Sequence, residues 1–510
     1  MMLRCVFVAF IIGLTPIAAK AAAKPIQVMA AGASPEGVWS GSFSVEGWQG
    51  GLLLELDKAS GHWTAAASVQ PSGRLATPPV ENIQVAGTKL SFELAVENER
   101  LRFEGSTTAR GLKGTVRMVG KSRPGQWSAV RLSTRLEPGK LPPPTGPFPV
   151  GRSHFVWTDE QRHEAASPNA AERRRLSVYV WYPAAHTAKC KAAPYLPDLD
   201  AMTPYLPIEV AQAIPNVRIP ACSDAPLSSA KTRFPVIIFA GGDEFKALAY
   251  SALQMDLASH GYIVAAIDFP YNAPVVVFPD NTRITHVEED APLPPAAADS
   301  TEDPRQRQLE QAKAEFDYWA HDISFVERQL AALDGLSDSI FYHRIDTLRV
   351  GAFGHSRGGL AVFHACQLDT AIHACANLDG RYRERPYPLS SPADAPHQPF
   401  LWIRGPVHVF TDDELTQRNV TRQQFQDEQS LRDSIMHATG KGSATLYIDE
   451  IGFDHLDFTD FRILETGISA EQRAARERIL EMTRRYLLEF FGELRTRPDR
   501  DAFPDATLVP

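Results

Sequence analysis

The sequence lacks the short motifs that mark the commonest cofactor sites. It has no HExxH or CxxC motif, and its fifteen histidines are dispersed, so we expect no metal site. It has neither a P-loop nor a GxGxxG motif, so we expect no nucleotide cofactor. Basic clusters are also missing from a chain of 510 residues with a formal net charge of −9, which argues against nucleic acid as a partner.

No apolar run is long enough to span a bilayer, and the longest one near the N-terminus is that of an export signal. Arg4 precedes the apolar stretch Cys5–Leu14, and alanine-rich sequence with A-x-A-like sites follows. We therefore predict a signal peptide over residues 1–23, a secreted or periplasmic protein, and no stable insertion in the membrane. A membrane anchor is the alternative that the short run disfavours.

Cysteine is scarce, and export makes disulfides possible for the four that follow the predicted signal. Proximity along the chain favours the pairs Cys190–Cys222 and Cys366–Cys375, and four free buried thiols are the alternative. The sequence gives no indication of the oligomeric state.

The pattern of short strands changes once along the chain. Residues 34–135 have alternating polar and apolar runs separated by Gly and Pro, which predicts an all-β, barrel-like domain with an accessory or, alternatively, a ligand-binding role. Residues 136–150 are crowded with proline and form a stiff linker. Residues 151–495 alternate strand and helix patterns, which predicts an α/β domain with a mostly parallel sheet. The remaining residues, 496–510, are predicted to be a disordered or loosely docked tail.

Within the α/β domain, buried strands are expected at Phe234–Ala240 and Arg349–Phe353, and long helices at Arg305–Leu333 and Ala470–Leu494. Two Pro-rich insertions, 190–222 and 275–304, follow the carboxyl ends of strands. They are candidate walls of a substrate site, or ordinary surface loops.

One motif organises the domain. The apolar run before Gly354-His355-Ser356-Arg357-Gly358 and the small residues after it predict a strand, a sharp turn and a helix. This is the nucleophile elbow of an α/β-hydrolase, in which the serine hydroxyl is exposed at the head of a helix. The side chain of His355 is expected to point away from the catalytic face.

A serine nucleophile needs a base and an orienting acid, which in this fold class follow in the order Ser, acid, His. Asp379 and His455 come in that order, each just after a predicted strand, so we predict a triad of Ser356, Asp379 and His455. Other acids and histidines are given structural or solvated roles; they are Asp346, Asp369, Asp449, Asp454, His373 and His437.

An oxyanion hole needs two N–H donors. The first is predicted to be the backbone N–H of Arg357, which follows the nucleophile. The second is expected in the turn after Phe234–Ala240, from Gly242 or Asp243. The carboxylate of Asp243 is compatible with a nearby oxyanion only if its side chain points away from the oxyanion.

Several blocks from about residue 145 onward resemble the secreted and type II platelet-activating-factor acetylhydrolase family. They include Val180-Trp181-Tyr182-Pro183, Asp256–Ala266, Gly354–Gly359, Leu378-Asp379 and Asp454-His455. By resemblance, Ser356, Asp379 and His455 carry over as the catalytic triad. The chain departs from the family in three places: Gly241-Gly242 replaces the usual His-Gly pair, Arg357 takes a position that is often aromatic, and the N-terminal β domain is additional.

Together the motifs and the resemblance predict a secreted serine carboxylic-ester hydrolase that works through an acyl-enzyme and needs no cofactor. Short-chain acyl esters or (phospho)lipid-derived esters are the expected substrates. Two alternatives remain: a hydrolase of other esters such as polyesters or lactones, and a ligand-binding protein with a degenerate hydrolase domain.

Overall fold

The computed structural model describes residues 34–496 with gaps. The gaps are residues 60, 72–75, 77, 97–98, 109–110, 132–139, 170, 187–189, 207, 288–303, 381–390, 406–410, 413–414, 416–419, 449–452, 466–467 and 469. The predicted signal peptide and nearly all of the predicted C-terminal tail lie outside the described residues. The chain divides after Arg131 into two compact units, with residues 69–76 grouped with the second.

The first unit is an antiparallel sheet of eight strands. They are β1 Gly37–Val45, β2 Trp48–Ala59, β3 His62–Pro71, β4 Val80–Ala86, β5 Lys89–Val96, β6 Glu99–Thr108, β7 Gly111–Met118 and β8 Gly125–Arg131. The order β3-β2-β1-β8-β7-β6-β5-β4 makes an up-and-down arrangement, and a bridge between Ala66 and Pro79 brings its two edges together. The predicted all-β, barrel-like class of this region is confirmed.

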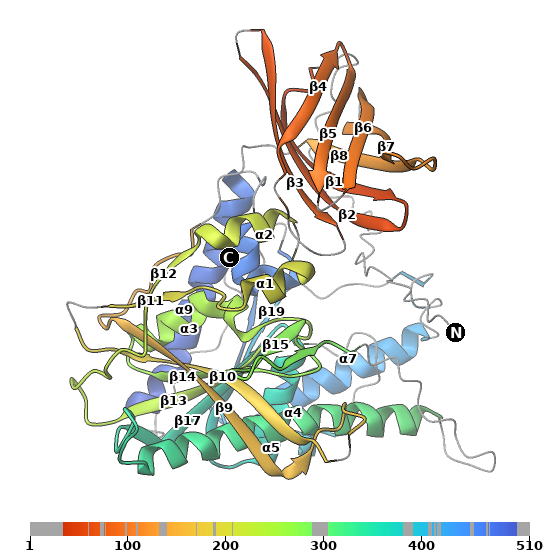
Figure 1. Cartoon of the computed structure of the whole chain (residues 1–510). Coiled ribbons are helices and arrows are strands. Elements are labelled where there is room, and N and C mark those ends of the chain that lie inside the picture. Colours follow the sequence, from red (N-terminus) through yellow and green to blue (C-terminus); the bar gives the residue numbers. More distant parts are fainter. Residues whose placement is uncertain are drawn as a thin grey trace. The chain divides into compact units, whose positions relative to one another are not determined.

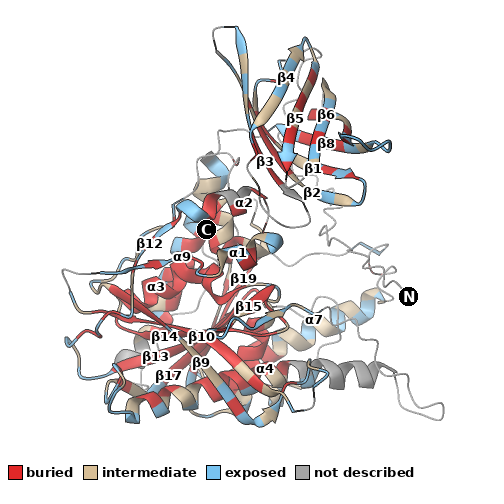
Figure 2. Ribbon diagram, in the orientation of Figure 1, coloured by how far each residue is buried: buried red, intermediate tan, exposed pale blue. Residues whose placement is uncertain are grey.

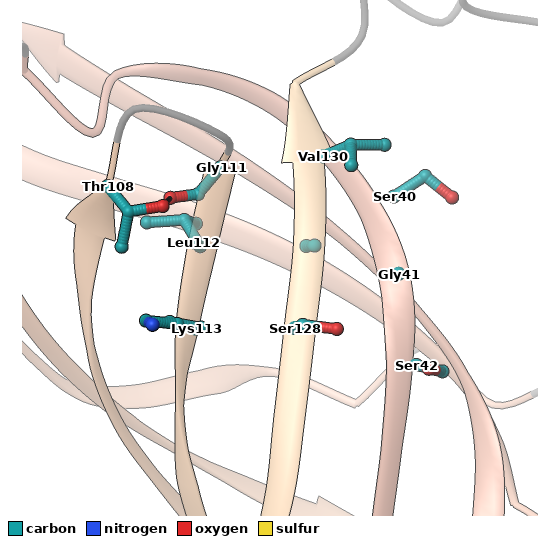
Figure 3. Close-up of a pocket in the computed structure, with 10 residues that line it drawn as sticks. Ser40, Gly41, Ser42, Thr108, Gly111, Leu112, Lys113, Ser128 and Val130 are labelled. Carbon is teal, nitrogen blue, oxygen red and sulfur yellow. Dashed lines mark hydrogen bonds between the residues drawn. The ribbon is translucent and has the colours of Figure 1, made fainter. Parts of the chain in front are cut away.

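Aromatic side chains pack inside this nearly closed sheet because every second residue of its strands points inward. Phe92 and Phe103 stack with their centroids 4.8 Å apart, and Trp127 meets Phe103 edge-on at 5.7 Å. A hollow of about 380 Å³ lies on the wall formed by β1, β7 and β8 (Figure 3). Glycines, serines, aliphatic side chains, Thr108 and Lys113 line it.

The second unit is built on a ten-stranded mixed sheet. Its strands are β9 Val150–His163, β10 Arg173–Pro183, β11 Ala192–Pro194, β12 Arg218–Ser223, β13 Phe234–Ala240, β14 Ile263–Asp268, β17 Ile345–His355, β18 Ile372–Leu378, β19 Phe400–Arg404 and β20 Ala444–Tyr447. The order is β11-β12-β9-β10-β14-β13-β17-β18-β19-β20. The six strands from β14 to β20 are parallel, as predicted, and β10 runs antiparallel to β9 and β14.

Helices cover both faces of this sheet (Figure 1). The α-helices are α1 Leu199–Met202, α2 Ile208–Ala213, α3 Ser251–Ser259, α4 Pro304–Gly335, α5 Arg357–Leu368, α7 Arg422–His437, α8 Asp460–Leu464 and α9 Ala470–Thr496. The 3₁₀-helices are η1 Thr203–Tyr205, η2 Ile214–Asn216, η3 Ala247–Tyr250, η4 Pro392–Asp394 and η5 His455–Phe458. The strands β15 Val275–Val277 and β16 Arg283–Thr285 form a separate two-stranded sheet. No helix in the described part of the chain is long and apolar enough to cross a membrane.

The continuous apolar runs of the central strands follow from burial on both faces (Figure 2). In β13, Val236 and Ile238 join the core shared with α4, α5 and α7, whereas Ile237 and Phe239 join the core shared with α3 and α9. The predicted buried strand at Phe234–Ala240 therefore lies at the centre of the sheet, and its carboxyl end leads directly into the Gly241–Asp243 turn.

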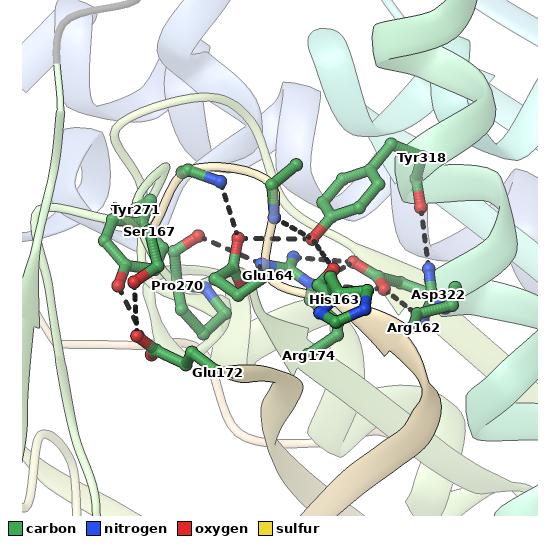
Figure 4. A network of polar contacts seen from close by, with 12 residues as sticks. Arg162, His163, Glu164, Ser167, Glu172, Arg174, Pro270, Tyr271, Tyr318 and Asp322 are labelled. Atoms are coloured by element: carbon green, nitrogen blue, oxygen red, sulfur yellow. Dashed lines mark hydrogen bonds and ion pairs between the residues drawn. The ribbon is translucent and has the colours of Figure 1, made fainter. Parts of the chain in front are cut away.

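A buried ionic cluster fixes α4 against the β9–β10 hairpin (Figure 4). The guanidinium of Arg174 binds Glu164 at 2.7 Å and Asp322 at 2.6 Å, and Arg162 binds the other Asp322 oxygen at 2.6 Å. Removing one partner of a buried ion pair costs about 3–5 kcal/mol, because the other charge is left uncompensated. The cluster therefore holds α4 in place, and α4 carries Trp319, whose ring lies under the guanidinium of Arg357.

Both disulfides that chain proximity favours are present. Cys190–Cys222 joins the ends of the first Pro-rich insertion, with Cα atoms 5.3 Å apart. Cys366–Cys375 joins α5 to β18, with Cα atoms 6.7 Å apart. The insertion is more than a surface loop, because Tyr195 and Met202 are buried in the core of the sheet.

Asp460 makes the stability of this unit depend on pH. Its carboxylate is fully buried, accepts the N–H of Ala252 at 3.1 Å and the hydroxyl of Tyr195 at 3.2 Å, and burial raises its pKa to about 7 from 3.8. Between about pH 4 and pH 7 the folded state thus holds a proton that the unfolded chain releases. The free energy of unfolding is therefore highest below about pH 4 and falls as the pH rises to about 7.

We expect Asp460→Asn, which resembles the protonated carboxyl, to remove this dependence. Between pH 5 and pH 8 the wild type should lose about 2–3 kcal/mol of unfolding free energy relative to the variant. Urea unfolding at both pH values measures the difference. If the unfolding free energies of the two proteins change equally between pH 5 and pH 8, the pH dependence does not come from Asp460.

Candidate active site

Ser356 lies at a strained turn between β17 and α5. Its φ of 55° and ψ of −123° place a non-glycine residue in a sparsely populated region. The flanking glycines allow the turn, since a Cβ on Gly354 would lie 2.3 Å from the carbonyl oxygen of Gly358, and one on Gly358 would lie 2.2 Å from that of Ala240. The Ser356 N–H donates to the carbonyl of Leu378 at 3.0 Å, which ties the turn to the end of β18.

The structure brings Ser356, His455 and Asp379 together in one chain of hydrogen bonds. His455 Nε2 lies 2.9 Å from Ser356 Oγ, and its Nδ1 lies 2.7 Å from Asp379 Oδ2. Asp379 is fully buried, and its second oxygen accepts the N–H of Gly405 at 3.1 Å. A carboxylate can only accept, so Nδ1 carries a proton and Nε2 of the neutral ring is free to take the serine proton.

The other candidate acids lie elsewhere or have structural partners. Asp346 accepts the N–H of Leu348 near the start of β17, and Asp369 accepts the N–H of Ala371 after α5. Asp454 caps η5 by accepting the N–H of Leu456, and Asp449 lies outside the described residues. Of the candidate acids that the structure describes, Asp379 is the one bonded to His455.

The turn after β13 runs beside the nucleophile, since a Cβ on Gly242 would lie 3.4 Å from that of Ser356. Three of its N–H groups have acceptors: Gly242 donates to Tyr250 Oη at 3.1 Å, Glu244 to Asn272 at 3.0 Å and Phe245 to Gly242 at 3.3 Å. The N–H of Asp243 has no acceptor in the described part of the chain. Of the two donors predicted from the sequence, Asp243 is therefore the one available to a substrate.

The side chain of Asp243 is held by the residue that follows the nucleophile. Its Oδ2 accepts from Arg357 Nη1 at 2.8 Å, and the Arg357 guanidinium lies over the ring of Trp319, 5.2 Å from its centroid. The negative charge of Asp243 is thus partly neutralised by Arg357. The two residues predicted to supply oxyanion donors are joined through their side chains.

Sequence reasoning missed the contacts of His355 and Tyr250. The ring of His355 is fully buried, with Nε2 2.9 Å from the carbonyl oxygen of His455 and Nδ1 2.8 Å from Tyr250 Oη. His355 was expected to point away from the catalytic face, but it contacts the backbone of the predicted base. The position of His355 beside the nucleophile was a usable signal, whereas Tyr250 is indistinguishable from a core tyrosine.

Among the described residues, no group of three or more His, Cys, Asp or Glu side chains is placed to hold a metal ion.

The chain is similar to several known ester hydrolases. A family model described as "Platelet-activating factor acetylhydrolase, isoform II" matches residues 135–465. A probable 1-alkyl-2-acetylglycerophosphocholine esterase of Arthroderma benhamiae is 25% identical over 255 residues, which are 47% of this chain and 58% of that protein. A platelet-activating factor acetylhydrolase of Cavia porcellus is 30% identical over 179 residues, which are 32% of this chain and 38% of that protein. The matches thus span less than two thirds of either relative.

A solved structure of a ferulic acid esterase from Streptomyces cinnamoneus shares the fold. It matches with a TM-score of 0.53 and 24% identity, over 73% of this chain and 97% of that one.

Proposed function

The chain belongs to the platelet-activating factor acetylhydrolase isoform II family of α/β-hydrolases, and from this premise we propose that it is a serine carboxylic-ester hydrolase acting through an acyl-enzyme. The observation that carries the proposal is the chain from Ser356 Oγ through His455 to Asp379, at 2.9 and 2.7 Å, set on a strained elbow. A hydroxyl bonded to an oriented imidazole is the arrangement that makes serine a nucleophile.

In the proposed reaction, Ser356 Oγ attacks the ester carbonyl while His455 Nε2 takes its proton. The developing oxyanion accepts from the N–H of Arg357, in the first turn of α5, and from the N–H of Asp243. The imidazolium of His455, stabilised by Asp379, protonates the leaving alkoxide. Water then repeats the sequence and releases the acid.

We propose short-chain acyl esters, including lipid-derived ones, as the substrate class. Two relatives with names that specify acetyl esters of glycerophosphocholine or platelet-activating factor support this choice. The N-terminal barrel (34–135) is proposed as an accessory domain, and residues 151–495, after the Pro-rich linker (136–150), as the catalytic one. Export is proposed from the signal-like N-terminus, and the two disulfides of the catalytic domain support it.

A fluorophosphonate probe tests the mechanism, because it reacts covalently with activated serines. We expect stoichiometric labelling of the full chain, with the modified peptide containing Ser356. Absence of labelling would favour a binding protein with a degenerate site, and labelling at another serine would overturn the assignment of the nucleophile.

A series of p-nitrophenyl esters from acetate to laurate tests the substrate class. We expect kcat/KM to be highest for acetate and to fall by about tenfold or more by octanoate, since even one methylene that the pocket cannot accept costs about 1–3 kcal/mol. A rise with chain length would contradict the short-acyl proposal and favour a lipase-like or polyester hydrolase.

A further inference from the structure

His355 and Tyr250 form a buried chain of hydrogen bonds between two parts of the site. The chain runs from the Gly242 N–H to Tyr250 Oη at 3.1 Å, from Tyr250 Oη to His355 Nδ1 at 2.8 Å, and from His355 Nε2 to the carbonyl oxygen of His455 at 2.9 Å. It therefore starts on the Gly241–Asp243 turn after β13 (the oxyanion turn), passes through the residue before the nucleophile and ends on the main chain of the base.

The chemistry of the end groups fixes the direction of this chain. A carbonyl oxygen only accepts, so His355 Nε2 carries the proton, and Nδ1 of the neutral ring accepts from the Tyr250 hydroxyl. The tyrosine oxygen then accepts the N–H of Gly242. Burial raises the pKa of Tyr250 well above its ordinary value, so the hydroxyl keeps the proton that it donates.

The glycine pair of the turn is fitted to the same two side chains. A Cβ on Gly242 would lie 3.1 Å from both Tyr250 Oη and His355 Nδ1, and one on Gly241 would meet the Tyr250 ring at 3.4 Å. These distances leave a side chain at Gly242 little room, so the turn rests directly on the tyrosine hydroxyl. The position of the neighbouring Asp243 N–H is set by that contact.

We propose that Tyr250 and His355 are positioning residues, which hold the oxyanion turn and the backbone of His455 at a fixed separation across Ser356. Both are fully buried, so they act through Gly242 and His455 rather than by touching substrate. The inference rests on the proposed serine mechanism. It assigns to the residue before the nucleophile, and to a core tyrosine, an effect on turnover rather than on substrate binding.

Tyr250→Phe tests this, because it removes the hydroxyl alone and keeps the ring. We expect kcat for p-nitrophenyl acetate to fall about 10- to 100-fold, as small misplacements of reacting groups do, with KM within about twofold of wild type. The rate of fluorophosphonate labelling should fall in parallel. Unchanged kcat, or a loss carried by KM alone, would overturn the proposal.

Tyr262→Phe is a matched control. Tyr262 is equally buried, and its hydroxyl also donates one hydrogen bond, in this case to the carbonyl of Phe491 in α9 at 2.7 Å. We expect it to lower the melting temperature as much as Tyr250→Phe does and to leave kcat unchanged. If both variants lose the same activity, the effect is general destabilisation and the positioning role is wrong.

A double-mutant cycle with His355→Asn separates a connected chain from two independent contacts. If the two residues act through one chain of hydrogen bonds, their losses of kcat should not add, so the double variant should be no slower than the slower single variant. Additive losses would contradict a connected chain of hydrogen bonds.

Ser356→Ala separates failure of the serine mechanism from failure of the positioning role. If Ser356→Ala stays active, the serine mechanism fails. If it is inactive while Tyr250→Phe is unaffected, the positioning role alone fails.

Discussion

Ser356→Ala is expected to lower kcat for p-nitrophenyl acetate by about four to six orders of magnitude, because the oxygen that would form the acyl-enzyme is gone. KM should change little, since no other group in the site is removed. Steady-state kinetics with the full chain measures the loss, and fluorophosphonate labelling should disappear with it. Retention of more than about 1% of kcat would contradict the assignment of Ser356 as the nucleophile.

The strain at this residue provides a control for folding. Alanine keeps the Cβ that φ 55° disfavours, so Ser356→Ala should unfold at nearly the wild-type temperature. Ser356→Gly removes the Cβ and should be equally inactive but more stable by about 1–2 kcal/mol. An inactive variant that is more stable than the wild type excludes misfolding as the cause of the lost activity.

The central strands were predictable because their burial is written locally in the sequence. The run Phe234–Ala240 is apolar throughout and matches β13 in full, since both faces of the strand are covered. Strand β9, Val150–His163, was not predicted. Its polar residues are accommodated by distant partners: Arg152 donates to the carbonyl of Pro194, and Arg162 binds Asp322, 160 positions away.

At the candidate site, too, features with a local signal in the sequence could be predicted, whereas features set by distant contacts could not. Ser356, Asp379 and His455 could be predicted as a triad because chain order and strand-end placement are local signals, and the structure places the three within hydrogen-bonding distance. The choice between Gly242 and Asp243 could not be made from the sequence. It depends on the hydroxyl of Tyr250, which accepts the N–H of Gly242 in the folded chain. Nothing in the sequence indicates that this tyrosine contacts the turn.

Asp379→Asn is expected to lower kcat by about 10⁴-fold while the protein stays folded. Asp379 uses two acceptors: Oδ2 receives His455 Nδ1–H and Oδ1 receives the N–H of Gly405. Asparagine offers one oxygen and one NH₂. If its oxygen faces Gly405, the NH₂ donates to Nδ1 and forces the proton onto Nε2, which then cannot take the proton of Ser356. If the amide is reversed, two donors face each other at the buried Gly405 N–H.

Asp369→Asn is the matched control, because Asp369 is a candidate acid whose carboxylate accepts the backbone N–H of Ala371 and is not bonded to His455. We expect it to keep wild-type kcat, and a larger loss from Asp369→Asn than from Asp379→Asn would show that the acid has been misassigned. The double variant Ser356→Ala, Asp379→Asn tests whether Asp379 acts through Ser356. In the proposed mechanism Asp379 acts only by orienting the base of Ser356, so its replacement should cause no further loss of kcat once the serine oxygen is absent. A further loss of kcat in the double variant would mean that Asp379 acts on the substrate by a route that does not pass through His455 and Ser356.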